Sequence, residues 1–256
     1  MYVKPKIILE ELEEKLKEIP IPDVLTITAN GEPTLYTYLD ELIDGVNRIK
    51  KSAKSLILSN SSTISDLVIR ENLKKLDIVK LSLDSVEDSV FKKIDRGMSG
   101  IKISNIIDGI IDFRGEYQGE LILEILLVKG VNDHISNAKE FKKYLEMIKP
   151  DRIDISTIHR PPAYDVNSVG FEYMERFAEE IGEFNIFLAS NQHVDTQNRM
   201  ISKDEFLNTI AKRPLTKYDI KTLFGDKTLQ LAESMSENNE ISKKSVGNIE
   251  FFTKKS

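Results

Sequence analysis

The chain has 256 residues, of which 40% are hydrophobic and 30% are charged, values typical of a folded globular protein and not of a disordered or fibrous one. Its 36 lysines and arginines against 42 acidic residues give a net charge of -6, which excludes a chain built throughout as a polycation for nucleic acid. The absence of cysteine excludes disulfides, thiol catalysis, zinc fingers and any iron–sulfur cluster held by thiolates of these residues.

The sequence contains no signal for a membrane or for secretion. No apolar run approaches the roughly 20 residues that a membrane-spanning helix needs. Residues 1–18 alternate charged residues with leucine, unlike a signal peptide. We therefore expect a cytoplasmic protein with no membrane partner.

Helical and strand-like patterns alternate along residues 1–190. Apolar residues at three- and four-residue spacing predict helices at 8–16, 38–50, 65–76, 87–114 (in two parts), 137–148 and 170–181. Short β-rich runs predict strands at 23–29, 55–59, 78–83, 121–128, 152–158 and 185–189. Strands separated by helices run parallel with right-handed crossovers. The pattern predicts an α/β fold, with a (β/α) TIM-type barrel favoured over a doubly wound sheet.

The predicted strands carry polar residues on one parity. Strands of a parallel sheet covered on both faces should be almost entirely apolar. Because a buried polar side chain is costly unless it is paired, this parity predicts a wet, ligand-holding lumen. For any single residue a satisfied core hydrogen bond is an equal explanation, but four strands together favour the lumen. The polar residues are Thr26, Thr28, Asn30, Lys80, Ser82, Asp84, Glu124, Asp154 and Ser156.

The pattern changes after residue 190. Residues 191–201 are rich in Asn and Gln and predict a linker between a domain at 1–190 and a domain at 202–256. Helices expected at 202–211, 216–224 and 226–236 precede a hairpin of residues 240–242 and 249–253. A capping box of Thr216 and Asp219 opens the second helix. Three helices and a two-stranded wing predict a winged helix-turn-helix.

One short motif has the composition of a ligand loop. Asn30-Gly31-Glu32-Pro33-Thr34 stands where a predicted strand ends and a helix follows, at the end of a parallel barrel where ligand loops gather. The glycine permits close backbone approach, the proline stiffens the loop, and the carboxylate suits an ammonium group. A simple strand-to-helix turn explains the motif equally well.

Five segments, in chain order, resemble a known family. They are TANGEPTL at 28–35, LILSN at 56–60, VKLSLDS at 79–85 with FKKIDRG at 91–97, LEILLVKGVND at 123–133 and KPDRIDISTIHRPPA at 149–163. Over about residues 1–190 the chain resembles the radical S-adenosylmethionine (SAM) superfamily, nearest to the prokaryotic Fe–S oxidoreductases associated with wyosine-base synthases. Members of that group tend to end in a small winged-helix-like module.

The resemblance implies a SAM site formed by the loops at the strand ends. Asn30-Gly31-Glu32-Pro33 matches the Gly-Gly-Glu-type motif, whose backbone and carboxylate hold the amino group of SAM. Ser59 and Asn60 match the end of the third strand of the family barrel, which lines the same site. Ser61 stands where a glycine is common, which leaves the backbone approach there less certain.

Further residues carried over from the family extend the implied site. Ser82 and Asp84 match positions that look toward the SAM carboxylate and ribose, and Glu124 and Val128–Gly130 match the region near the adenosine. Arg160 is a candidate for a substrate anion or the SAM carboxylate, and a surface arginine before a rigid turn is the equal alternative.

The chain departs from the family in its cluster ligands. Family members hold a [4Fe–4S] cluster through CxxxCxxC after the first barrel strand, and its electron cleaves SAM to a 5′-deoxyadenosyl radical that abstracts a substrate hydrogen. This chain has no cysteine and starts at the helix that follows the cluster loop. We therefore expect a partial barrel without the first strand and cluster loop, with an unpaired edge at 24–29 and no activity by itself.

Three hypotheses follow. The first is the SAM-binding barrel portion of a radical SAM oxidoreductase, either truncated or half of a split enzyme with a separate cluster-bearing N-terminal piece, acting on a small molecule or tRNA. The second is a cluster-free module that binds SAM or RNA. The third is a transcription regulator with a ligand-sensing barrel.

The positions of the basic residues and the histidines indicate which partners and metals the chain could bind. The third helix of the predicted winged helix carries Asp226, Lys227, Glu233 and Glu237, while the wing carries Lys243, Lys244, Lys254 and Lys255. This distribution favours RNA contact or docking onto the barrel over sequence-specific DNA binding. The three histidines, at 134, 159 and 193, have no zinc-site spacing, so we expect no metal ligands in the chain.

Overall fold

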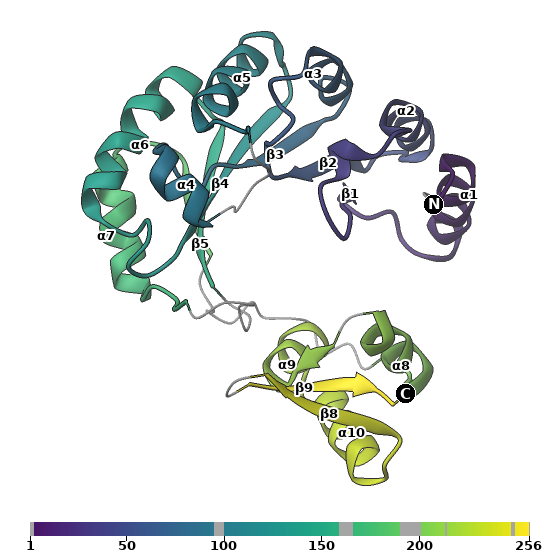
Figure 1. The fold of residues 1–256 in the computed structure, drawn as a ribbon. Helices are drawn as coiled ribbons and strands as arrows, with labels where there is room; N and C mark the ends of the chain where they lie inside the picture. Colours follow the sequence, from purple (N-terminus) through teal and green to yellow (C-terminus); the bar gives the residue numbers. More distant parts are fainter. Residues whose placement is uncertain are drawn as a thin grey trace. The chain divides into compact units, whose positions relative to one another are not determined.

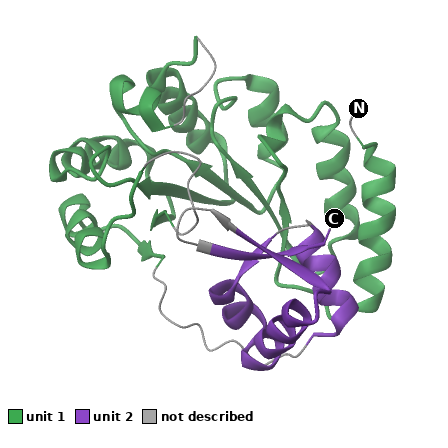
Figure 2. Ribbon diagram, turned by 60° about the horizontal axis from the view of Figure 1, so that its bottom comes forward, with its two compact units in different colours: residues 1–158, 165–189 green, residues 159–164, 190–256 purple. Residues whose placement is uncertain are grey.

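The computed structural model describes residues 3–94, 100–158, 166–189, 201–212, 214–246 and 249–255 (Figure 1). The chain divides into two compact units, residues 1–158 with 165–189 and residues 159–164 with 190–256 (Figure 2). Within the described ranges, no helix is long and apolar enough to cross a membrane.

Unit 1 is built on a six-stranded parallel sheet whose strands follow chain order. The strands are β1 (Val24–Ile27), β2 (Lys54–Ser59), β3 (Ile78–Ser82), β4 (Glu120–Leu127), β5 (Arg152–Thr157) and β6 (Ile186–Leu188). The helices are α1 (Pro5–Glu18), η1 (Pro33–Leu35), α2 (Leu39–Ile49), α3 (Leu67–Leu73), α4 (Asp88–Ile94), α5 (Ile103–Glu116), α6 (Ile135–Ile148) and α7 (Phe171–Ile181). The prediction of an α/β fold with a partial barrel of parallel strands is confirmed.

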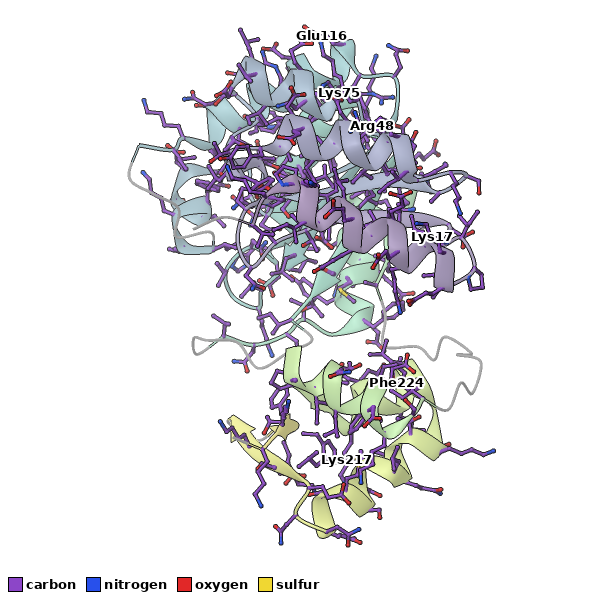
Figure 3. The ribbon with its side chains drawn as sticks, turned by 90° about the vertical axis from the view of Figure 1, so that its right-hand side faces the viewer. Lys17, Arg48, Lys75, Glu116, Lys217 and Phe224 are labelled. Carbon is purple, nitrogen blue, oxygen red and sulfur yellow. The ribbon has the colours of Figure 1, made fainter. Side chains whose placement is uncertain are left out.

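The two faces of this sheet differ in polarity. Helices α2, α3, α5, α6 and α7 lie along one face in Figure 1, where the side chains of Ile57, Val79 and Leu121 are completely buried. The outer helix surfaces carry charged side chains such as Lys17, Arg48 and Glu116 (Figure 3). The period-two alternation of the strands thus separates an apolar face from a polar one.

The sheet face opposite the helices is called the open face below. Its residues are Thr26, Leu58, Lys80, Ser82, Ile122, Glu124, Arg152, Asp154 and Ser156, the parity opposite to the buried one. The predicted polar residues that fall within the strands therefore share this one face, whereas Thr28, Asn30 and Asp84 lie beyond the strand ends.

Unit 2 combines three helices with a small antiparallel sheet. Its elements are α8 (Lys203–Lys212), β7 (Leu215–Thr216), α9 (Lys217–Phe224), α10 (Asp226–Glu237), β8 (Ile241–Val246) and β9 (Ile249–Lys254), with strand order β7-β9-β8. Phe206, Ile220 and Phe252 form its buried centre. The predicted capping box of Thr216 and Asp219 is confirmed. The assignment of a winged helix-turn-helix stays a prediction.

A polar cluster joins the amino ends of β2 and β3 to α2. The carboxylate of Asp77 accepts hydrogen bonds from the Lys50 ammonium, from the Ser55 backbone N–H (2.7 Å) and from the Ser55 hydroxyl (2.9 Å). Burial acts to raise the pKa of Asp77, but Lys50 and Ser55 outweigh it and hold that pKa below its ordinary value. The ionised carboxylate is therefore part of what fixes the strand ends.

We expect Asp77→Asn to lower the free energy of unfolding at pH 7 by about 1–2 kcal/mol, because the amide nitrogen cannot accept these hydrogen bonds. A carboxyl whose pKa is depressed on folding stabilises above its unfolded pKa and loses that contribution as pH falls through its folded pKa. The difference between the wild type and Asp77→Asn should therefore shrink below about pH 4, which urea unfolding at several pH values measures.

Asp108→Asn is the matched control, since Asp108 is exposed on α5 and no described residue pairs with it. It should leave stability almost unchanged at every pH. A difference for Asp77→Asn that persists unchanged at acid pH would contradict the assigned role.

Candidate functional site

Glu32 organises the loop that follows β1. It caps η1, and its Oε1 accepts hydrogen bonds from the Thr34 backbone N–H (3.0 Å) and hydroxyl (2.6 Å). Its Oε2 accepts from the backbone N–H of Asn60, just beyond β2, at 2.6 Å. Pro33 occupies the first position of η1, where a missing N–H costs nothing. The structure thus brings Asn30-Gly31-Glu32-Pro33 together with Ser59 and Asn60.

The same loop leaves acceptors for a cation. A carboxylate offers about four acceptor positions, and Thr34 and Asn60 occupy three of those on Glu32. No described residue donates a hydrogen bond to the carbonyl oxygen of Asn30 or of Gly31. One carboxylate position and two carbonyls equal in number the three N–H donors of an ammonium group.

Ser61 fixes the loop after β2 against β3. Its φ is +65°, in the left-handed region that favours glycine, and it is completely buried. Its hydroxyl donates to the Ser82 carbonyl at 2.7 Å, and its N–H donates to the Ser59 hydroxyl at 3.1 Å. The serine thus reaches the backbone shape that a glycine would adopt, and adds a link between neighbouring strand ends.

Asn132 joins the ends of β3 and β4 and is not among the residues that the sequence predicts for the site. Its buried amide donates to the carbonyls of Asp84 (2.8 Å) and Leu126 (2.7 Å) and accepts from the Val128 N–H (2.7 Å). Asp84 Oδ1 accepts from the Leu126 N–H at 2.8 Å. The only sequence signal is an amide residue two positions after Gly130, which makes a positive-φ turn.

Glu124 lies on the open face of β4, at the level of the last residue of β3. Its backbone is in register with Ser82 and Asp154. The Lys80 ammonium lies 2.8 Å from Glu124 Oε1 and 2.9 Å from Asp154 Oδ2, and Arg152 Nε lies 2.7 Å from Asp154 Oδ1. Burial acts to lower the pKa of Lys80, but the two carboxylates outweigh it and raise that pKa. The contact of Glu124 with an adenosine stays a prediction.

The remaining site predictions concern Arg160 and metals. Arg160 lies outside the described residues, so its contact with an anion stays a prediction. Across the part of the chain that the structure describes, no group of three or more His, Cys, Asp or Glu could hold a metal ion. Since the sequence also lacks cysteine, these residues do not fit a [4Fe–4S] cluster.

Some basic residues of unit 2 are paired with carboxylates of the same unit. The ammonium groups of Lys217, Lys221 and Lys243 lie 2.7, 3.0 and 3.1 Å from carboxylates of Glu233, Asp226 and Glu250. Lys244 and Lys254 are exposed on the hairpin. RNA contact through this hairpin stays a prediction.

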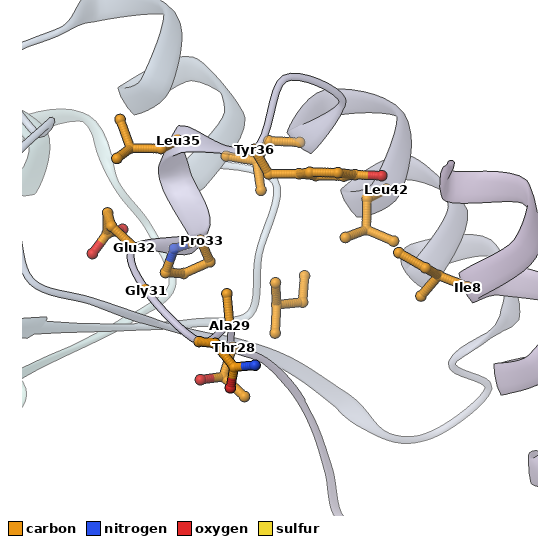
Figure 4. Close-up of a pocket in the computed structure, with 12 residues that line it drawn as sticks. Ile8, Thr28, Ala29, Gly31, Glu32, Pro33, Leu35, Tyr36 and Leu42 are labelled. Carbon is orange, nitrogen blue, oxygen red and sulfur yellow. The ribbon is translucent and has the colours of Figure 1, made fainter. Parts of the chain in front are cut away.

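A cavity of about 460 Å³ borders the β1 loop (Figure 4). In Figure 4 the carboxylate of Glu32 points away from the part of the cavity lined by Ile8, Tyr36 and Leu42. The loop therefore separates the polar contacts of Glu32 from an apolar space. The full lining is Ile8, Leu35, Tyr36, Leu39, Leu42 and the consecutive residues 27–33.

The fold places unit 1 in a known class. A radical SAM methyltransferase from Sphaerobacter thermophilus matches the chain with a TM-score of 0.59 and 15% identity, covering 73% of this chain and 57% of that structure. Streptococcus suis SuiB bound to S-adenosylmethionine matches with a TM-score of 0.57 and 17% identity, covering 81% of this chain and 49% of that structure. Unit 1 therefore has the fold of radical SAM enzymes, and the resemblance inferred from the sequence is confirmed.

The sequence relatives identify the family. No family model matches the chain. A Helicobacter pylori protein described as a UPF0026 protein is 34% identical over 253 residues, which are 98% of this chain and 82% of the relative. The chain belongs to the UPF0026 family. An S-adenosylmethionine-dependent nucleotide dehydratase from a Thermoplasmatales archaeon is 27% identical over 60% of this chain and 55% of its own length.

Ser61 offers a direct test of the loop after β2. Ser61→Ala and Ser61→Gly both remove the hydroxyl bond to Ser82, but only glycine adopts a positive φ without steric cost. We expect Ser61→Ala to be less stable than Ser61→Gly by about 1–2 kcal/mol. Chemical unfolding of both variants measures the difference, and equal stabilities would contradict the assignment of backbone strain to this position.

Proposed function

We propose that unit 1 binds SAM at the loops after β1, β2 and β3, as the SAM-holding part of a radical SAM enzyme. The observation that carries the proposal is the acceptor set of Asn30, Gly31 and Glu32. The α-amino group of SAM is an ammonium at neutral pH, so its three N–H donors fit the open carboxylate position and the two carbonyls. The SAM-bound neighbour and the SAM-dependent relative support this choice of ligand.

Two residues extend the proposed SAM site along the strand ends. The hydroxyl of Ser82 is partly exposed, and no described residue forms a hydrogen bond with it. It therefore suits the carboxylate of SAM, beside the amino group. The backbone N–H of Val128 is already bonded to Asn132, which leaves its side chain to contact the adenosine through packing.

Other members of the proposed site act by positioning. Asp84 accepts a hydrogen bond from the Leu126 N–H and so fixes the end of β4. The hydrogen bond from the Asn60 N–H to Glu32 fixes the position of Asn60. Glu124, with Lys80 and Asp154, forms a charged floor below the loops. That floor suits a polar substrate, such as a small molecule or a nucleotide of tRNA.

When it is bound and reduced, SAM supplies this enzyme class with a radical that abstracts a substrate hydrogen. The residues of this chain bind and orient SAM but contribute no thiolate for an electron-donating cluster. We therefore expect the purified chain to bind SAM without cleaving it. Cleavage would require cluster ligands from outside these 256 residues. A cluster-free binding module is the second candidate, and binding tighter than micromolar by the chain alone would favour it.

Glu32→Gln tests the proposed contact with the amino group. We expect SAM affinity to fall about tenfold or more, since hydrogen bonds to charged groups contribute roughly 1.5–3 kcal/mol. Affinity for 5′-methylthioadenosine, which lacks the amino acid, should stay unchanged. Isothermal titration calorimetry with both ligands measures the ratio, and the second ligand also reports whether the loop remains folded.

Glu146→Gln is the matched control, because Glu146 is exposed on α6, far along the chain from the loops. It should leave both affinities unchanged. Absence of SAM binding by the wild type, or an equal loss of both ligands in Glu32→Gln, would contradict the proposal.

A further inference from the structure

One row of side chains on the open face runs from the proposed SAM site to an exposed aromatic ring. The row consists of register partners on β3, β4, β5 and β6, which are Ser82, Glu124, Asp154 and Phe187. Register partners in a parallel sheet place their side chains on the same face, and neighbouring strands are about 4.8 Å apart, so the row spans about 14 Å. It links Ser82 to a phenylalanine that the proposed function does not use.

Phe187 exposes its ring on this face. The residues on either side of it, Ile186 and Leu188, pack against the hydrophobic core, whereas Phe187 is 58% exposed. Among the described residues, no other aromatic ring and no cation lies against it. A single exposed apolar side chain is common on protein surfaces, so the inference depends on the residues beside Phe187.

Asp154, the neighbour of Phe187 in the row, has no acceptor to offer a ligand. Its Oδ1 accepts a hydrogen bond from Arg152 Nε at 2.7 Å. Its Oδ2 accepts from the Lys80 ammonium at 2.9 Å and from Arg152 Nη2 at 3.2 Å. Because both oxygens are paired within the sheet, a ligand above Asp154 contacts a neutralised group and does not have to break an ion pair.

Glu124, the next residue in the row, keeps an acceptor open. Its side chain is 36% exposed, and Lys80 is its one charged partner among the described residues, with Nζ at 2.8 Å from Oε1. A carboxylate offers about four acceptor positions, so those of Oε2 remain available. Lys80 and Arg152 together balance the charges of Glu124 and Asp154. The open acceptor therefore suits a neutral N–H donor better than a second cation.

We propose that the open face holds a nucleobase that carries an exocyclic amino group. The base stacks on Phe187 and donates a hydrogen bond from its amino group to Glu124. Aromatic side chains are the usual stacking partners of bases, and carboxylates accept from amino groups of bases. An anionic ligand would be repelled by Glu124, and an aliphatic one would not use the flat ring.

This inference rests on the proposed function, because it names the substrate class of a SAM-dependent reaction. The register row places the base between Phe187 and the SAM that Ser82 would contact. Phe187 and Glu124 are then the residues that determine which substrate is accepted.

Calorimetry on the full chain saturated with SAM tests the choice of ligand, because SAM then fills its own adenosine site. The probes are two pairs of nucleoside 5′-monophosphates, guanosine with inosine and cytidine with uridine. Within each pair only the first base carries an exocyclic amino group. We expect the amino-bearing member of at least one pair to bind about tenfold more tightly than its partner.

Substitutions test the two contacts. Phe187→Ala should weaken the preferred nucleotide about tenfold, whereas Phe187→Tyr keeps the aromatic face and should bind like the wild type. Glu124→Leu should abolish the preference within the pair, because leucine offers no acceptor. Phe171→Ala is the matched control, since Phe171 is an exposed phenylalanine at the start of α7, and it should change nothing. Circular dichroism confirms the folding of each variant.

A free nucleotide and a nucleotide of RNA present the same base, and a short single-stranded RNA of the preferred base distinguishes them. Tighter binding of the RNA than of the mononucleotide identifies RNA as the source of the base. Equal or weaker binding identifies a free nucleotide. Both results support the proposal if Phe187→Ala weakens the binding.

Three outcomes would overturn this inference: no nucleotide or RNA binds the SAM-saturated wild type, the members of both pairs bind equally, or Phe187→Ala binds as tightly as the wild type. A separate titration of the wild type with SAM keeps these outcomes distinct from a failure of the proposed function. Absence of SAM binding contradicts the proposed function itself, whereas normal SAM binding without nucleotide binding contradicts the inference alone.

Discussion

The structure of unit 1 depends on hydrogen bonds from side chains to backbone that link the carboxyl ends of neighbouring strands. Glu32 bonds to Asn60 beyond β2, Ser61 to Ser82 of β3, Asp84 to Leu126 of β4 and Thr157 to Leu127. Parallel strands have no hairpin to align their ends, so these bonds hold the loops together. The entropy cost of ordering these loops is then incurred on folding, so a ligand that binds there does not incur it again.

The open face shows a different use of polar residues. Asp154 is 8% exposed, yet it lies between Lys80 and Arg152, so its charge is paired on both sides. A buried ion pair is weak evidence for stability, because desolvation offsets much of the attraction. Lys80, Glu124 and Asp154 are charged residues inside strands, where apolar ones would pack, and therefore point to a role on this face other than stability. Such a role is consistent with a polar substrate held above them.

Local patterns in the sequence were enough for the elements and for the polar parity of the strands, because period and side-chain alternation are local properties. The pairing of side chains across strands could not be predicted from local patterns. Lys80 reaches across β4 to Asp154, 74 residues away, and this contact depends on register that no local pattern encodes. Transfer from the family placed Glu124 in the site, but its ion pair with Lys80 depends on the same register and could not be predicted. The two-residue strand β7 is too short to have a period.

The loop at residues 30–33 has two chemically different sides. The carboxylate of Glu32 accepts a hydrogen bond from Asn60 beyond β2, whereas the backbone of the same loop lines the apolar cavity beside β1. Glu32 also caps η1 through the Thr34 N–H, so the polar side of the loop is held by hydrogen bonds that form on folding. A ligand that binds on this side therefore does not have to order the loop again.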